Sequence, residues 1–186
     1  VTTGEGGMVL VKNRKHAEQA RLLRNLCFQP ERRFLHETLG YNYRLTNIQA
    51  AMGVGQLERI EEIIVAKRKI ACNYNDAFSG IAGVKLPIEM PWARSVYWVY
   101  GVLLDSERNI DAAQVIQRLM EKGVEARPFF LGMHEQPVFI KMGLFLRETY
   151  PVTENLARNG FYLPSGLTLT NAQVAVVISA LKEVLL

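Results

Sequence analysis

Residues 39–51 read Leu39-Gly40-Tyr41-Asn42-Tyr43-Arg44-Leu45-Thr46-Asn47-Ile48-Gln49-Ala50-Ala51. The first part of this stretch has no helical or strand period, but it is dense in aromatic and polar side chains. Thr46 and Gln49 then have the spacing of a capping box, in which the threonine hydroxyl accepts from the backbone N–H of Gln49. The stretch therefore predicts a loop that runs into a long helix, which we expect to continue past residue 70.

Two glycines, Gly53 and Gly55, lie inside this expected helix. Each costs about 1 kcal/mol relative to Ala in a helix interior, which is tolerated where another backbone packs closely. They therefore indicate a helix-on-helix contact.

Glycines and prolines between residues 79 and 91 end the helical pattern. We expect a domain boundary near residue 75, with one domain over 1–75 and a smaller one over 76–186.

The remaining segments alternate between strand and helix patterns. Residues 8–11 are a short apolar run that indicates a buried strand, and residues 15–26 have a helical stripe. The other expected elements are a strand over 97–104, a helix over 111–122, a strand over 124–127 and a helix over 171–186, which is opened by a second capping box. This alternation around a small sheet is typical of the α/β class.

Composition excludes several classes of protein. Of the 186 residues, 49% are apolar and 22% are charged, which is typical of compact globular proteins and excludes disordered and collagen-like chains. No apolar run reaches the ~20 residues of a membrane-spanning helix, so no membrane contact is expected. Cys27 and Cys72 have no CxxC spacing, and we expect two buried free thiols in a reducing, cytoplasmic compartment.

The net charge of +4 is concentrated in the first part of the chain, because residues 1–75 hold 12 Lys and Arg against 7 Asp and Glu. A basic half suits a phosphorylated small molecule, a nucleic acid or a solvated helix face. The aromatic residues do not interleave with the basic ones as a platform for single-stranded nucleic acid requires. Nucleic acid is therefore not an expected partner.

Asn42 and Arg44 are the strongest candidates for a binding site. They place an amide and a guanidinium just ahead of a helix N-terminus, where backbone N–H groups and the helix dipole favour negative charge. Arginine adds a fork that binds phosphate through two hydrogen bonds. The same residues are equally consistent with a loop in which Tyr41 and Tyr43 pack while Asn42 turns the chain.

A second irregular stretch carries Arg127, Phe129, Phe130 and His134. A lone histidine is more often structural than functional. Neither His36 nor His134 has a Cys, an Asp or a second His at metal-ligand spacing, so no metal site is expected. The sequence has no GxSxG element, which leaves a hydrolase without support.

Three ordered motifs lie at residues 2–9, 39–51 and 56–60. The first reads Thr2-Thr3-Gly4-Glu5-Gly6-Gly7-Met8-Val9, and the third reads Gln56-Leu57-Glu58-Arg59-Ile60. Together they resemble the DegT/DnrJ/StrS family of sugar-nucleotide aminotransferases, and the resemblance spans most of the chain. Residues 25–34 and 123–130 are most similar to the perosamine synthetase branch of that family.

The resemblance implies a pyridoxal phosphate enzyme of the aspartate aminotransferase fold, fold type I. Such an enzyme is a homodimer with active sites at the subunit interface, and it moves an amino group from glutamate to a 4-keto-6-deoxy sugar nucleotide. This chain would be its C-terminal portion, with the end of the large domain, a long linking helix and a small α/β domain. The family's cofactor lysine would lie just upstream of Val1, so the resemblance gives this chain no catalytic residue.

Several site residues are implied by the same resemblance. Asn42 matches the asparagine that reaches the cofactor phosphate of the partner subunit, and Arg44 either binds a phosphate or braces the loop. The loop with Arg32, Arg33 and His36 would lie near the partner's nucleotide, and His134 would lie near the sugar. The expected substrate-binding residues are Arg33, His36, Arg127 and His134.

Two alternatives to this aminotransferase stay open. In one, residues 76–186 form a binding or regulatory module without catalysis, and the basic loop captures nucleotides or nucleic acid. In the other, the protein is a relative that carries a histidine in place of the lysine and dehydrates a keto-deoxy sugar. The position that separates this relative from an aminotransferase lies upstream of Val1.

Overall fold

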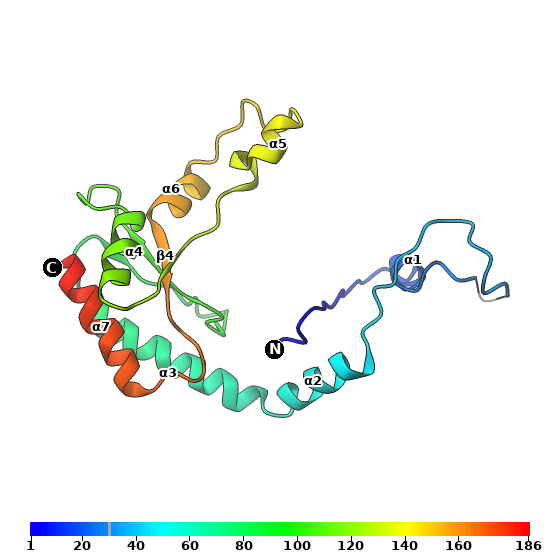
Figure 1. Ribbon diagram of the computed structural model, residues 1–186, viewed down its shortest axis with the longest axis horizontal. Coiled ribbons are helices and arrows are strands. Elements are labelled where there is room, and N and C mark those ends of the chain that lie inside the picture. Colours follow the sequence, from blue (N-terminus) through cyan, green and yellow to red (C-terminus); the bar gives the residue numbers. More distant parts are fainter. Residues whose placement is uncertain (30) are drawn as a thin grey trace. The chain divides into compact units, whose positions relative to one another are not determined.

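The computed structural model describes residues 1–29 and 31–186, which divide into two compact units, Val1–Ile60 and Glu61–Leu186 (Figure 1). Each unit has its own elements. Among the described helices, none is both long and apolar enough to cross a membrane. The two units divide between Ile60 and Glu61. The domain boundary predicted near residue 75 stays a prediction.

The first unit contains helices α1 (Arg14–Arg24) and α2 (Asn47–Leu57). The side chain of Asn13 caps α1, and the predicted capping box at the start of α2 is confirmed. The buried strand expected over residues 8–11 is wrong, because this segment is not part of any strand and Leu10 is 89% exposed. An apolar run forms a strand only where another strand satisfies its backbone groups.

The long helix expected from residue 46 is divided at Glu58 and Arg59. α2 ends before these two residues, and α3 (Ile60–Phe78) begins after them. The backbone N–H of Arg59 donates to the carbonyl of Gln56 at 3.1 Å, an i to i−3 bond that tightens and ends α2. The α-helical ladder is therefore interrupted even though the apolar stripe continues.

The helix-on-helix contact expected at Gly53 and Gly55 is wrong. Gly53 lies against the side chain of Thr3, and Gly55 has open space beside it. The side chain of Gln56 binds both the backbone N–H and the carbonyl of Thr2, at 2.9 and 2.6 Å. The neighbour of α2 is thus the extended N-terminal segment, and the absent side chain of Gly53 admits it.

The second unit is built around an antiparallel sheet with four strands in the order β1-β2-β4-β3. After α3 its elements are β1 (Val84–Lys85), β2 (Tyr100–Leu104), α4 (Ala112–Glu121), β3 (Arg127–Pro128), a 3-10 turn (Met133–Glu135), α5 (Pro137–Lys141), α6 (Pro151–Asn159), β4 (Gly160–Leu163) and α7 (Asn171–Leu185). The helices predicted over 111–122 and 171–186 are confirmed, and the strand predicted over 97–104 is confirmed over Tyr100–Leu104 only. The strand expected over 124–127 is displaced to β3, and β4 has no counterpart among the expected elements.

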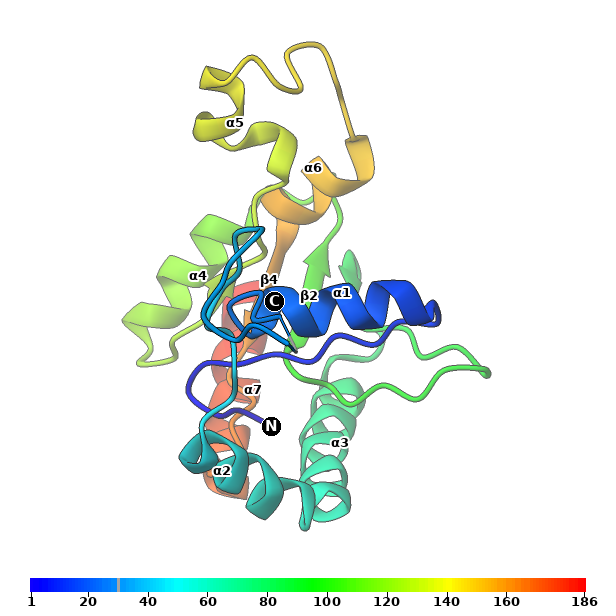
Figure 2. The same cartoon turned by 90° about the vertical axis from the view of Figure 1, so that its right-hand side faces the viewer.

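One face of this sheet carries the core. The register pairs Tyr100 with Leu163 and Val102 with Phe161, so these four side chains point to the same face, and each is at most 2% exposed. Helices α3, α4 and α7 supply the buried side chains that pack against them. Figure 2 shows β2 and β4 among these helices. The mixed α/β fold is therefore held by helices on one side of a small sheet.

An ion pair between Arg68 and Glu89 helps to hold the loop before β2 to α3. Arg68 of α3 donates to the two carboxylate oxygens of Glu89 at 2.7 and 2.9 Å, and Glu89 also accepts from the backbone N–H of Ser95 at 2.7 Å. These bonds, first of all the one from Arg68, lower the pKa of Glu89 to about 2. While it stays ionised, the Glu89 carboxylate therefore joins α3 to the loop and also joins two parts of the loop, Glu89 and Ser95.

Because Phe161 is buried in the core and Phe130 is exposed, we expect the two residues to contribute very differently to the free energy of unfolding. Truncating the buried Phe161 to Ala is expected to lower the free energy of unfolding by about 3–5 kcal/mol, because the cavity it leaves lies between β4 and the helices. Phe130 is 73% exposed, and Phe130→Ala should change stability by less than about 0.5 kcal/mol. Urea denaturation of both variants measures the difference, and equal losses would contradict this description of the core.

The ion pair of Glu89 predicts a dependence of stability on pH. Its folded pKa lies below the usual 4.5, so the stability it adds is complete above pH 4.5 and is lost as the pH falls towards about 2. Glu89→Gln should therefore lower the midpoint of thermal unfolding at pH 7, and its difference from the wild type should shrink between pH 4.5 and 2. The control Glu107→Gln, on an exposed turn, should show no such trend.

Candidate functional site

The loop that carries Asn42 is fixed to the end of α1 by a close backbone contact. Any side chain at Gly40 would overlap the backbone of Leu26 and Cys27, both of which have positive φ, at 60° and 52°. Backbone bonds join Tyr41 to Leu23 at 2.7 Å and Leu26 to Tyr41 at 3.0 Å. Cys27 is buried as predicted. Glycine at residue 40 is therefore what allows the loop to lie flat on the helix end.

Asn42 and Arg44, the two candidates for an anion site, contact each other, and their role in binding stays a prediction. Asn42 forms an isolated antiparallel bridge with Asn25, and Arg44 Nε donates to Asn42 Oδ1 at 3.0 Å. Because the amide oxygen faces the guanidinium, the NH2 group of the amide is turned away from it. Tyr41 and Tyr43 stack with their centroids 5.1 Å apart. The tyrosines therefore pack, and the amide and guanidinium stay exposed to solvent.

Arg33 and His36 share one aromatic neighbour, Phe28. The guanidinium of Arg33 lies 5.5 Å from the Phe28 ring centroid and 5.7 Å from that of Phe34, and the His36 ring lies 5.3 Å from Phe28. His36 Nδ1 is 2.8 Å from the carbonyl oxygen of Leu26. Since a carbonyl only accepts, Nδ1 carries the proton. The two side chains form a basic, aromatic cluster within the first unit.

Arg127 lies on β3, at the edge of the sheet in the second unit. Its Nε and Nη2 donate to the same carboxylate oxygen of Glu125, at 3.1 and 2.9 Å. This hydrogen bonding raises the pKa of Arg127 above its ordinary value. On the neighbouring strand, Tyr162 is its direct cross-strand partner. The guanidinium therefore contacts both the carboxylate of Glu125 and the side chain of Tyr162, and it stays largely exposed.

His134 is a buried polar residue, with 8% of its surface exposed. Its Nε2 lies 3.1 Å from a carboxylate oxygen of Glu154 on α6, and its ring packs against Tyr150 at 4.8 Å. The backbone N–H of Tyr150 is the main cause of the lowered pKa of Glu154, and the bond from His134 adds to it. His134 therefore ties the 3-10 turn to α6, and its expected role in binding substrate stays a prediction.

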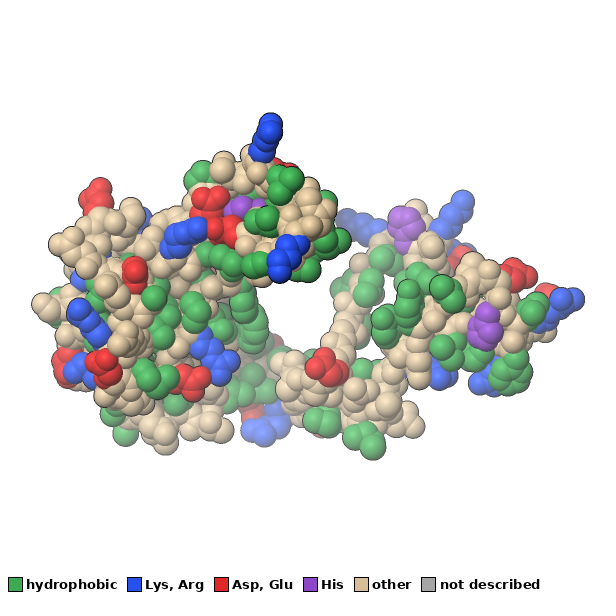
Figure 3. Space-filling view, turned by 45° about the horizontal axis from the view of Figure 1, so that its top comes forward, with side chains coloured by type: hydrophobic (Ala, Val, Ile, Leu, Met, Phe, Trp, Pro, Cys, Tyr) green, Lys and Arg blue, Asp and Glu red, His purple; other side chains and the backbone are tan. Residues whose placement is uncertain are grey.

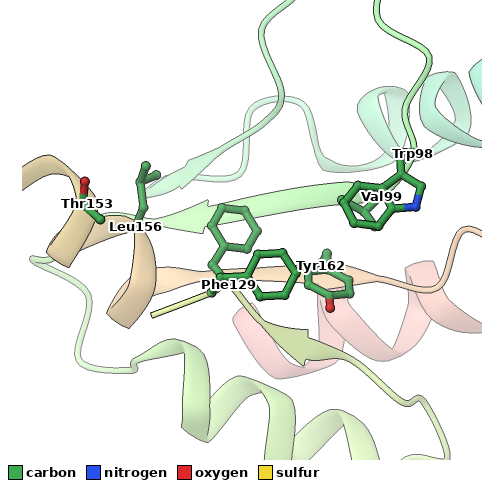
Figure 4. Close-up of a pocket in the computed structure, with 7 residues that line it drawn as sticks. Trp98, Val99, Phe129, Thr153, Leu156 and Tyr162 are labelled. Carbon is green, nitrogen blue, oxygen red and sulfur yellow. The ribbon is translucent and has the colours of Figure 1, made fainter. Parts of the chain in front are cut away.

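The opposite face of the sheet holds a hollow of about 300 Å³ that the sequence motifs do not mark. Its lining is almost entirely apolar and comes from Trp98, Val99, Phe129, Phe130, Thr153, Leu156 and Tyr162. In Figure 4, Trp98 and Tyr162 lie towards one end, and Thr153 and Leu156 lie at the other. The sequence marks this hollow only through its aromatic residues at 97–100 and 129–130. Their pattern alone does not say which face of the sheet they lie on, because that depends on the strand register.

Candidate metal ligands and cysteines both lie in the described part of the chain. Among residues 1–29 and 31–186, no group of three or more His, Cys, Asp or Glu side chains is placed to hold a metal ion. The expectation of two buried thiols holds for Cys27 only, because Cys72 on α3 is exposed. Figure 3 shows hydrophobic side chains at the surface of both units, interspersed with basic ones.

A double-mutant cycle tests the contact between His134 and Glu154. His134→Gln and Glu154→Gln should each lower the midpoint of thermal unfolding, and the double variant should lose less than the sum, because the second change removes a partner already lost. The control cycle pairs His134→Gln with Glu183→Gln. Glu183 binds Lys122 and Ser179 instead, so its effect should be additive. Additive losses in both cycles would mean that the contact contributes nothing.

The chain matches curated proteins along its whole length. It is 36% identical over 186 residues to the GDP-perosamine synthase of Caulobacter vibrioides, which covers 100% of this chain and 49% of that protein. It is 34% identical to the putative pyridoxal phosphate-dependent aminotransferase EpsN of Bacillus subtilis, with 97% and 46% covered. The chain therefore spans about half the length of the curated relatives it matches.

The fold and the family agree with these relatives. The aminotransferase TlmJ from Streptoalloteichus hindustanus superposes with a TM-score of 0.85 at 26% identity, over 98% of this chain and 48% of that one. Residues 1–182 match the model of the DegT/DnrJ/EryC1/StrS aminotransferase family. The predicted resemblance and the predicted fold are confirmed. This chain belongs to the DegT/DnrJ/EryC1/StrS aminotransferase family and corresponds to the C-terminal portion of its members.

Proposed function

We propose that this chain is the C-terminal portion of a pyridoxal phosphate-dependent aminotransferase that moves an amino group from glutamate to a 4-keto-6-deoxy sugar nucleotide. The observation that carries the proposal is the pair of Asn42 and Arg44, with the amide oriented by the guanidinium just ahead of α2. The 36% identity to a GDP-perosamine synthase supports a perosamine-type substrate.

The donors in this loop fit the phosphate of the cofactor. The amide of Asn42 offers two N–H donors, and the guanidinium of Arg44 keeps donors beyond the Nε that binds the amide. Both precede the start of α2, where the helix dipole favours an anion. Pyridoxal phosphate, when bound, supplies an electron sink for charge on the substrate carbon. The part of this chain is to hold the phosphate.

We further propose a homodimer in which the loop of one protomer serves the cofactor of its partner. The exposed apolar surface of α2 supports a further contact, since Ile48 is 77%, Leu57 56% and Met52 49% exposed. Arg33 and His36 would then face the partner's nucleotide. Arg127 and His134 are proposed to bind substrate within their own unit, with glutamate and the sugar nucleotide as the two substrates.

Asn42→Ala in the complete enzyme is expected to weaken cofactor binding roughly 10- to 100-fold, because a hydrogen bond to a charged phosphate contributes about 1.5–3 kcal/mol. Absorbance titration with pyridoxal phosphate measures the affinity. Asn171→Ala is the matched control, since Asn171 is exposed at the start of α7. If the Asn42 variant and this control bind pyridoxal phosphate with equal affinity, Asn42 does not bind the cofactor.

The position of the cofactor lysine is tested by borohydride trapping and peptide mapping. We expect the pyridoxyl label on a lysine upstream of Val1 in the complete protein. Lys67 is the lysine here most suited to compete, because burial lowers its pKa. Specific labelling of Lys67 would contradict the proposal. A histidine at the upstream position, without any label, would favour the dehydratase instead.

A further inference from the structure

The alternation of side chains breaks just before β2. In a regular strand Trp98 would lie on the same face as Tyr100, and Tyr97 on the face opposite the core, which we call the open face. Instead Tyr97 and Tyr100 are both buried, with their rings 6.5 Å apart. Trp98 is 72% exposed, and it lines the hollow of the open face together with Val99 (Figure 4). An irregular backbone therefore turns Trp98 onto the open face.

The irregularity lies at Tyr97, whose backbone is left-handed with a φ of 46°. For a residue with a Cβ this conformation is disfavoured roughly 5- to 30-fold, so it persists only where its surroundings fix it. The guanidinium of Arg68 lies 5.7 Å from the Tyr97 ring centroid and donates to the carbonyl of Ser95 at 2.7 Å. The backbone N–H of Tyr97 donates to the Ser95 hydroxyl at 3.2 Å. These contacts hold the chain on the N-terminal side of Tyr97.

Lys67 of α3 holds the chain on the C-terminal side. Its ammonium donates to the backbone carbonyl of Trp98 at 2.9 Å, to that of Ser165 at 2.5 Å and to the Ser165 hydroxyl at 3.1 Å. An ammonium has three N–H donors, and each has an oxygen acceptor here. Two consecutive residues of α3, Lys67 and Arg68, thus hold the backbone on both sides of the left-handed residue.

The ammonium stands where the bonds between β2 and β4 end. Tyr100 pairs with Leu163, and the same register continued by two residues would bring Trp98 opposite Ser165. Pro164 lies between, and it has no backbone N–H to continue the ladder. Two carbonyls cannot bond to each other, because both only accept. The Lys67 ammonium therefore supplies the donor that joins the two strand ends.

The charge of Lys67 is held at a cost. Burial lowers its pKa below the ordinary 10.5, and its three acceptors are neutral oxygens rather than a carboxylate. An apolar side chain of similar length would fill the same space without this desolvation. Packing alone therefore does not explain an ammonium at this position, whereas the two carbonyls it joins do.

We propose that Lys67 is a positioning residue, which joins Trp98 to Ser165 and thereby maintains the left-handed Tyr97 that directs Trp98 to the open face. Without the ammonium, the backbone at Tyr97 relaxes to the extended conformation, and Trp98 leaves its place beside Val99. A ligand or partner of the open face then meets a different wall. The inference goes beyond the proposed function and does not rest on it, because it concerns the conformation of this chain alone.

The test uses fluorotryptophan at residue 98 as the reporter. In the Trp92→Phe background Trp98 is the only tryptophan, so fluorine NMR reports on it alone. Lys67→Met should move most of the signal to a new resonance, because the relaxed backbone becomes the major form. Lys67→Arg keeps charged donors and should restore most of the original resonance. The matched control is Lys69→Met, at an exposed position of α3, which should leave the resonance in place.

An alkaline titration tests the same contact without a variant that could fail to fold. Deprotonated Lys67 has two N–H donors for three acceptors, so the resonance should begin to move below pH 10.5. Of the groups nearby, Arg68 is bound to Glu89, and burial raises the pKa of Tyr74, whose hydroxyl binds the Pro164 carbonyl, to about 12. Lys67→Arg does not titrate in this range and corrects for the ionisation of other tyrosines.

Two results would overturn the proposal. One is a Lys67→Met variant that is folded by urea denaturation and keeps the original resonance, since a loss of stability alone would make Lys67 merely structural. The other is an alkaline shift that Lys67→Arg shows in full. Neither readout requires pyridoxal phosphate, an upstream lysine or transamination, so the outcome is independent of the aminotransferase proposal.

Discussion

The pairing of β2 with β4 is the contact on which the second unit depends. Its register places Val102 opposite Phe161 and Gly101 opposite Tyr162, so successive residues alternate between the two faces. One face is filled with large side chains and is sealed by helices. The other carries Gly101 and Gly160, and the ring of Phe129 lies against the strands at these two residues. A shift of one residue would exchange the faces, and would lose the core and the aromatic hollow together.

Local chemistry explains which parts of the fold could be predicted from the sequence. The capping boxes at Thr46 and Thr170 and the helix that ends before Gly123 depend on neighbouring residues alone, and all three are confirmed. The run at residues 8–11 has the composition of a strand but no strand beside it. β4 is short and begins with Gly160, so its place at the centre of the sheet comes from its partners rather than from its own pattern.

The same distinction applies to the candidate site. Asn42 and Arg44 are two residues apart, so their contact could be anticipated from the loop itself. The partners of His134 and Arg127 differ in this respect. Glu154 reaches His134 across 20 positions of sequence, and Tyr162 lies beside Arg127 only because β3 pairs with β4. Such partners are set by tertiary structure, which a spacing pattern does not encode.

The exposed aromatics of the open face also bear on how the chain behaves in solution. Trp98 and Phe130 present apolar surface that favours self-association. At neutral pH the net charge of +4 opposes it through repulsion between copies, and that repulsion vanishes near the sequence pI of about 9.1. Mildly acidic, low-salt buffers therefore preserve dispersed protein, whereas alkaline buffers remove the charge that keeps these aromatic surfaces apart.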